Sequence, residues 1–114
     1  MKKLTKIAII GYGFVGKAVE AGFKNPQNDI MIVDPYKGYH NLDDLEGYQP
    51  DFTFVCVPTP MGKDGAIDDT IISEVVSHLQ QMPCGAVIIK STVTPDLVNK
   101  LCQYKRFVYN PEFL

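Results

Sequence analysis

Short apolar runs alternate with longer segments in which apolar residues recur every three or four positions. The runs are typical of buried parallel strands, which lack polar alternation, and the recurring positions indicate amphipathic helices. Strands are expected at residues 6–10, 30–33, 52–57, 86–89 and 106–109, with helices at 14–23, 42–46, from 68 or 69 to 82, and from 95 onward. This alternation predicts a single α/β domain with a doubly wound parallel sheet in three α/β/α layers.

The ends of these elements carry recognisable signals. Thr94 and Pro95 are typical of a helix start, because threonine caps the free N–H groups and proline fits the first turn. Residues 34–50 are the least regular part of the chain. There Asn41 is the expected cap of the short helix. A third strand would be confined to Tyr39–His40.

The segment Gly11-Tyr12-Gly13-Phe14-Val15-Gly16 joins the first strand to the first helix. Gly-x-Gly-x-x-Gly in this context is the fingerprint of a dinucleotide-binding, Rossmann-type domain. Gly11 permits the tight turn, Gly13 lets the backbone approach a pyrophosphate, and Gly16 allows the helix to pack closely on the strand. The helix N-terminus supplies N–H groups and partial positive charge to the pyrophosphate. The alternative is that the glycines only form a turn.

Asp34 ends the second strand about twenty residues after the fingerprint, as the motif requires. A carboxylate at this position accepts hydrogen bonds from the adenosine ribose and repels a 2′-phosphate, so the pattern favours NAD over NADP. Two alternatives stay open. In the first, Asp34 is only a solvated acid at a strand end. In the second, the positive charge of the nearby Lys37 weakens the repulsion of the 2′-phosphate of NADP.

Composition narrows the classes of partner. The 114 residues, 46% hydrophobic and 21% charged, fit one ordinary globular domain. The net charge is −2 without a basic run, which argues against nucleic acid and anionic membranes. No apolar stretch approaches the ~20 residues of a membrane span. The three cysteines are odd in number and unclustered, so they predict no metal site and fit the reduced thiols of a cytoplasmic protein.

Three further segments follow predicted strands: Val57-Pro58-Thr59-Pro60, Ser91-Thr92-Val93 and Asn110-Pro111-Glu112-Phe113-Leu114. All three should line one crevice, because ligands of an open α/β sheet sit beyond the carboxyl ends of its strands. Hydroxyls of Thr59, Ser91 and Thr92 fit contacts with a ribose, a nicotinamide amide or a water. Turn and cap chemistry is the alternative, and for Ser91 the two are balanced. Glu112 is either a general base with a pKa raised by burial or a surface acid.

Together these segments resemble the N-terminal part of the UDP-glucose/GDP-mannose dehydrogenase family. The matching residues are Gly11 to Gly16, Asp34, Val57 to Pro60, Lys90 to Val93 and Tyr109 to Leu114. The match extends over nearly the whole chain, and the compact residues 34–50 resemble the shorter bacterial and phage members. The resemblance implies oxidation of a nucleotide sugar at C6, from alcohol to carboxylate, in two NAD-dependent steps. UDP-glucose, giving UDP-glucuronate, is the foremost expected substrate.

The resemblance also implies residue roles. In it, NAD contacts come from Gly11, Tyr12, Gly13, Phe14, Val15, Gly16, Asp34, Val57, Pro58, Thr59, Ser91 and Thr92. Thr92 also positions a catalytic water, and Glu112 performs acid/base work on thioester hydrolysis. The sugar nucleotide is approached by Glu112, Phe113 and Leu114.

The sequence departs from the family in what is absent. The nucleophilic cysteine of the family lies in a downstream Gly-Gly-x-Cys-x-Pro-Lys-Asp segment, which this sequence lacks. The catalytic lysine and the sugar-binding domain are absent as well. We therefore expect residues 1–114 to be an NAD-binding domain, inactive alone, from a truncated chain or gene fragment. Homodimers stay open.

Two other classes of protein remain alternatives. One is a non-enzymatic dinucleotide-binding or interaction module. The other is an S-adenosylmethionine-dependent methyltransferase, which also uses a glycine loop and an acid at the second strand.

Overall fold

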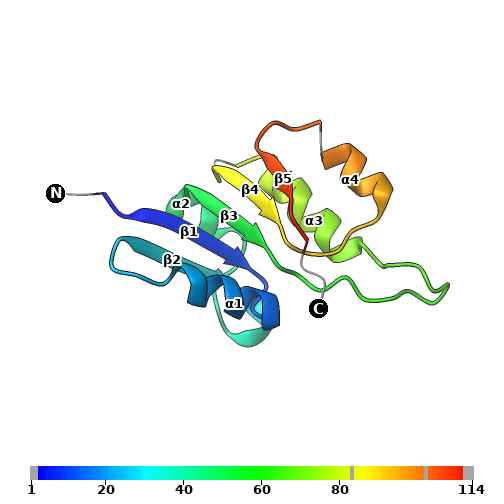
Figure 1. Ribbon diagram of the computed structural model, residues 1–114, viewed down its shortest axis with the longest axis horizontal. Helices are drawn as coiled ribbons and strands as arrows, with labels where there is room; N and C mark the ends of the chain where they lie inside the picture. The colour runs from blue at the N-terminus through cyan, green and yellow to red at the C-terminus, as the bar shows by residue number, and fades with distance from the viewer. Residues whose placement is uncertain (1–2, 83, 102, 112–114) are drawn as a thin grey trace.

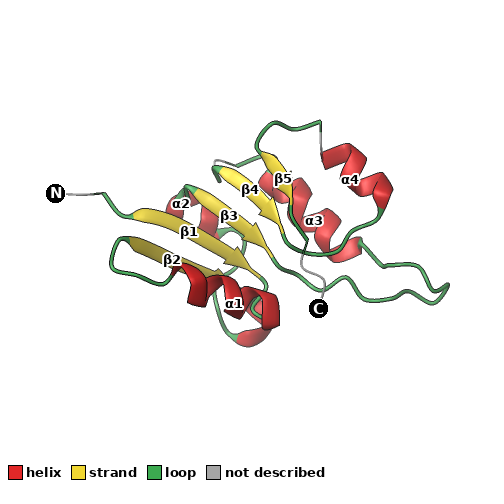
Figure 2. Cartoon of the chain, in the orientation of Figure 1, coloured by secondary structure: helices red, strands yellow, loops and turns green. Residues whose placement is uncertain are grey.

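The computed structural model describes residues 3–82, 84–101 and 103–111. Within them one sheet of five parallel strands carries helices on both faces (Figures 1 and 2). The strands are β1 Thr5–Ile10, β2 Asn28–Val33, β3 Phe52–Val55, β4 Ala86–Ile89 and β5 Phe107–Tyr109. The helices are α1 Phe14–Phe23, α2 Asp44–Tyr48, α3 Thr70–Leu79 and α4 Pro95–Leu101, with a 3₁₀ turn, η1, at Pro35–Lys37. The predicted α/β Rossmann-type fold is confirmed.

The strands lie in the order β2-β1-β3-β4-β5. The chain therefore runs outward from β1 to β2, then crosses back to place β3 on the other side of β1. This reversal creates a switch point at the carboxyl ends of β1 and β3, where ligands of doubly wound sheets bind. The third strand expected at Tyr39–His40 is reduced to one parallel bridge between His40 and Val33, on the outer edge of β2.

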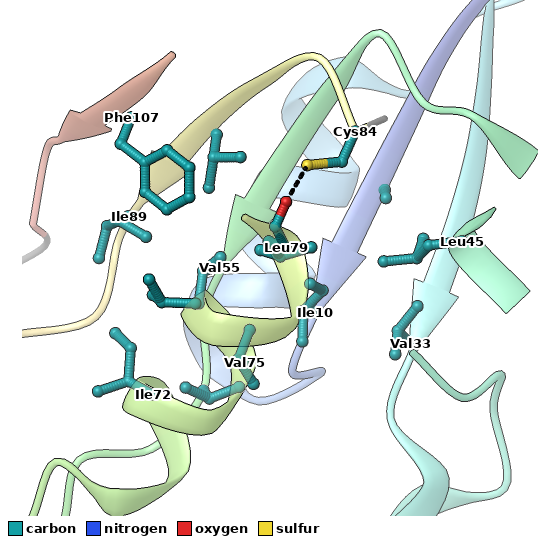
Figure 3. Close-up of a cluster of buried hydrophobic side chains, with 14 of the residues drawn as sticks. Ile10, Val33, Leu45, Val55, Ile72, Val75, Leu79, Cys84, Ile89 and Phe107 are labelled. Atoms are coloured by element: carbon teal, nitrogen blue, oxygen red, sulfur yellow. Dashed lines mark hydrogen bonds between the residues drawn. The ribbon is translucent and has the colours of Figure 1, made fainter. Parts of the chain in front are cut away.

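Apolar clusters cover the two faces of the sheet. On one face the β1 residues Ile7 and Ile9 pack with Val15 and Val19 of α1. On the opposite face α3 packs four buried side chains into the cluster, including Ile72, Val75 and Leu79, which Figure 3 labels. Residues of α2 and α4 join this second cluster, namely Leu45 and Leu101. One helix thus covers the first face and three helices contribute to the second.

Several predicted element ends differ from the structure: β2 begins at Asn28 rather than residue 30, and α3 ends at Leu79 rather than 82. Two further differences have an identifiable cause. Asn41 is not the cap of α2, because its carbonyl accepts the N–H of Asp44 in a turn that precedes the helix, and Asp43 takes the cap position. β3 ends at Val55 rather than at residue 57, although the Cys56 N–H still donates to Ile10 O at 2.7 Å. The chain leaves the sheet there because it passes close over the glycine loop.

The start of α4 agrees with its signal. Thr94 Oγ1 accepts a hydrogen bond from the Leu97 N–H at 3.3 Å, as a helix cap does. At the start of α3 the carboxylate of Asp68 accepts the N–H of Thr70 at 3.0 Å. It also accepts the Thr70 hydroxyl, at 2.6 Å. These bonds form a turn that leads into the helix.

Candidate functional site

A cavity of about 910 Å³ lies at the carboxyl ends of the strands. The structure brings four of the sequence-predicted segments to its wall. From the glycine loop and α1 come Gly11, Tyr12, Gly13, Phe14 and Val15, and from the end of β2 comes Asp34. The segments after β3 and β4 contribute Val57, Pro58, Thr59, Ser91 and Thr92. Sequence segments up to 80 residues apart, from Gly11 to Ser91, therefore meet around one space.

Gly16 lies beneath the cavity rather than in its wall. A Cβ on Gly16 would overlap the carbonyl oxygen of Gly11 and lie 3.4 Å from Cγ2 of Ile9. The absence of a side chain thus lets α1 sit close against the loop and β1. This is the packing role that the fingerprint predicts for its third glycine.

The other two glycines differ in their surroundings. Gly11 has a φ of +94°, a conformation that L side chains rarely adopt, and a Cβ there would lie 2.6 Å from Cys56 O. A Cβ on Gly13 would meet nothing within 4 Å. Gly11 is therefore fixed by the crossing of two chain segments. Gly13 leaves open space at the start of α1, where the helix has N–H groups without intrahelical partners.

Asp34 lies half-buried at the end of β2, beside the loop. Its Oδ2 accepts the backbone N–H of Tyr12 at 3.0 Å. A carboxylate has several acceptor positions, so this bond leaves capacity for hydroxyl groups of a ligand. The position and chemistry of Asp34 fit the ribose-binding role that the sequence predicts.

The side chain of Tyr12 packs against α1. Its hydroxyl donates to Glu20 Oε1, and the Lys17 ammonium lies 5.5 Å from the ring centroid. The ring also meets Tyr39 edge-on, with centroids 5.0 Å apart. The hydrogen bond to Glu20 is the main cause that raises the pKa of Tyr12 to about 12. Tyr12 is therefore a neutral, fixed side chain at ordinary pH.

Ser91 serves the structure of the cavity wall. It is 7% exposed, and its hydroxyl donates to Val57 O at 2.7 Å. The bond ties the segment after β4 to the segment after β3. This contact joins residues 34 positions apart, so it is neither a local turn nor a helix cap, and the contact of Ser91 with a cofactor stays a prediction. Thr59 and Thr92 are half-buried and line the cavity.

The sequence analysis missed one wall of the cavity. This wall comes from η1, the segment before α2, and α3, and includes Tyr36, Leu42, Asp43, Ile71, Glu74 and His78. Across it, His78 Nε2 lies 3.7 Å from Asp43 Oδ1. The available signal was the spacing of Ile71, Glu74 and His78, which places them along one side of a helix. Ile71 lies at one of the apolar positions of α3 but is 41% exposed.

Three predicted site residues, Glu112, Phe113 and Leu114, lie outside the described residues. In the part of the chain that the structure describes, no group of three or more His, Cys, Asp or Glu side chains is placed to hold a metal ion. The described helices also include none with the length and apolar character needed to cross a bilayer.

Comparison with known proteins identifies the fold. No family model and no curated protein matches the sequence. A solved structure, a UDP-glucose dehydrogenase from the hyperthermophilic archaeon Pyrobaculum islandicum, is similar with a TM-score of 0.69 and 20% sequence identity. The similarity covers 99% of this chain and 37% of that protein. The chain thus has a dehydrogenase-like Rossmann fold and spans little more than a third of that neighbour.

Proposed function

We propose that this chain is the NAD-binding domain of a nucleotide-sugar dehydrogenase, with UDP-glucose as the foremost substrate of the complete enzyme. The observation that carries the proposal is the placement of Asp34 beside the glycine loop, on the wall of the cavity at the switch point. The order of motifs along the sequence and the fold shared with a UDP-glucose dehydrogenase support it.

The residues present fit the cofactor. Gly13 leaves room for a pyrophosphate, and the first turn of α1 offers N–H groups and the positive end of the helix dipole. Asp34 has acceptor capacity for the adenosine ribose. Bound NAD would supply the hydride acceptor for oxidation of an alcohol. The chain's own contribution in this proposal is to bind and orient the cofactor, and Thr92, in the segment after β4 on the cavity wall, would hold a water or an amide.

Titration calorimetry with NAD and NADP tests the cofactor. We expect NAD to bind and NADP to bind much more weakly. Asp34→Asn should weaken NAD binding about tenfold or more, because a hydrogen bond to a charged group is lost. It should also narrow the preference for NAD. Asp96→Asn, on α4, makes the same charge change outside the cavity wall and serves as control.

Two results would contradict the cofactor assignment. Equal affinities for NAD and NADP would remove the role given to Asp34. Binding of S-adenosylmethionine without binding of NAD would favour the methyltransferase alternative.

The substrate needs a separate test. The chain mixed with NAD and UDP-glucose should form no NADH, because residues 1–114 include neither the sugar-binding domain and catalytic lysine needed for the first oxidation nor the cysteine motif needed for the second. The coding gene beyond residue 114 should encode a Gly-Gly-x-Cys-x-Pro-Lys-Asp segment. Steady NADH production by the 114 residues alone would refute the proposal that they bind the cofactor without catalysing the oxidation.

A further inference from the structure

The backbone N–H and C=O of Tyr12 each form a hydrogen bond with a side chain, from Asp34 just after β2 and from Lys37 in η1. The N–H of Tyr12 donates to Asp34 Oδ2 at 3.0 Å. The carbonyl oxygen of Tyr12 accepts a hydrogen bond from Lys37 Nζ at 2.7 Å. Two residues of opposite charge therefore form hydrogen bonds to the backbone in the middle of the glycine loop. The second bond has a charged donor, which makes it stronger than a bond between neutral groups.

The turn η1 brings these two side chains together. Lys37 N–H donates to Asp34 O at 3.0 Å, and Gly38 ends the turn with a φ of +82°. The turn reverses the chain, so that the side chains of Asp34 and Lys37 both reach the backbone of Tyr12.

The hydrogen bond from Lys37 to the Tyr12 carbonyl also determines the direction of the Gly13 N–H. The Tyr12 carbonyl shares a planar trans peptide with the N–H of Gly13, and in such a peptide the C=O and N–H point in opposite directions. When Lys37 holds the carbonyl, the Gly13 N–H is turned away from Lys37. Gly13 is the residue with open space at the start of α1.

The loop needs such a restraint because glycine flanks Tyr12 on both sides. Glycine loses more conformational freedom than other residues when it is ordered, and it accepts many backbone angles. A rotation of the Tyr12–Gly13 peptide would present a carbonyl oxygen, rather than an N–H, to a ligand phosphate. The two negative groups would then repel each other.

We propose that Lys37 is a positioning residue, which holds the Tyr12–Gly13 peptide in the orientation that accepts a pyrophosphate. The inference rests on the proposed NAD function for its ligand. It assigns Lys37 a task on the protein backbone, whereas the sequence analysis considered it only as a modifier of NADP exclusion. Two residues of α1 add a second anchor for Tyr12, since Glu20 accepts its hydroxyl proton and the Lys17 ammonium lies over its ring.

The first test uses the ligand-free chain and NMR. Lys37→Met should shift the Gly13 amide nitrogen, since that nitrogen reports hydrogen bonding at the carbonyl of its own peptide. It should also speed hydrogen exchange at the Tyr12 N–H, while the exchange of Ile9, inside β1, stays unchanged. Lys37→Arg, which keeps a charged donor, should restore both signals. Lys24→Met removes a charge at the far end of α1 and is the matched control.

The second test compares ligands with and without a pyrophosphate. Lys37→Met should weaken NAD and ADP by about fivefold or more, the size expected for one hydrogen bond. It should leave adenosine within about twofold of the wild-type affinity. Lys37→Arg should recover the affinity for ADP.

The outcomes separate the two proposals. An unshifted Gly13 signal in Lys37→Met, or an equal loss of adenosine and ADP affinity, overturns the positioning role. The second result would mean that Lys37 contacts the nucleoside directly. If the wild-type chain binds neither NAD nor ADP, the proposed function fails and the ligand part of this inference fails with it. In that case the ligand-free spectra still decide whether Lys37 holds the peptide.

Discussion

Replacing Gly16 by alanine tests whether the close contact between α1 and the glycine loop is essential. A Cβ at this position would overlap Gly11 O and lie 3.1 Å from Gly11 C, inside the ~3.5–4.0 Å of an ordinary carbon contact. The atoms in the way belong to the backbone, so they cannot rotate aside as a side chain would. Either α1 or the loop must shift by roughly 1 Å to restore ordinary contact.

The magnitude follows from two opposing effects. Overpacking of this kind costs about 1–3 kcal/mol, and an unyielding backbone places Gly16→Ala near the upper end. Alanine gains about 1 kcal/mol over glycine inside a helix. The net expected loss of stability is about 2 kcal/mol, which lowers the melting temperature by roughly 8 °C in a domain of this size.

Gly22 provides the matched control, because it lies in the same helix and its added Cβ would meet nothing within 4 Å. Gly22→Ala should be neutral or stabilising by up to about 1 kcal/mol. Urea unfolding followed by circular dichroism measures both variants. The reasoning is refuted if Gly16→Ala unfolds at the wild-type urea midpoint, or if both variants lose the same stability. Where Gly16→Ala stays folded, we also expect it to bind NAD more weakly, because the loop has moved.

Two further predictions concern stability. Thr53 is fully buried and its hydroxyl donates to Cys84 O at 2.9 Å, so Thr53→Val should cost about 1–3 kcal/mol in urea unfolding by leaving that carbonyl without its partner. Thr53→Ser keeps the donor as control, and an unchanged midpoint for valine would contradict the argument. Hydrogen bonds from Thr70 hold the pKa of Asp68 below its ordinary value of 3.8. The ionised carboxylate therefore stabilises the folded chain above pH 3.8. This stabilisation is lost as the pH falls below 3.8 and through the lowered pKa of the folded chain. Asp68→Asn should therefore flatten the acid side of the stability profile, and an identical acid limb in both proteins would disprove the assignment.

The fold was predictable where the local pattern and the tertiary packing agree. The bounds of α1 and β4 are those expected. The apolar residues of α1 lie along one side of the helix, and those of β4 form one continuous apolar run, so each pattern identifies its element. Asn41 misled because a suitable capping residue also forms turns, and only the hydrogen bond from Asp44 N–H distinguishes the two. The exposure of Ile71 was not predictable, because helical spacing identifies an apolar face without showing what covers it.

The candidate site was predictable at its loops and not at its wall. The glycine spacing and the strand ends locate the cavity, because both depend on general properties of parallel sheets. The wall formed by η1, the segment before α2, and α3 depends on how these elements pack against one another, which no local pattern encodes. The bonds of Asp34 and Lys37 to Tyr12 likewise depend on a turn geometry that brings distant backbone atoms within reach.

The position of β1 between β2 and β3 has a consequence for biosynthesis. β1 leaves the ribosome before the other four described strands of its sheet, and β2 can pair with it as soon as α1 and β2 have been made. The other edge of β1 stays unpaired until β3 has been made. The face of β1 that carries Ala8 and Ile10 stays uncovered until α3, which ends at Leu79, has been made. At translation rates of about 5–20 residues per second, that interval lasts several seconds. The nascent chain therefore exposes an apolar face and an open strand edge long enough for a chaperone to bind it.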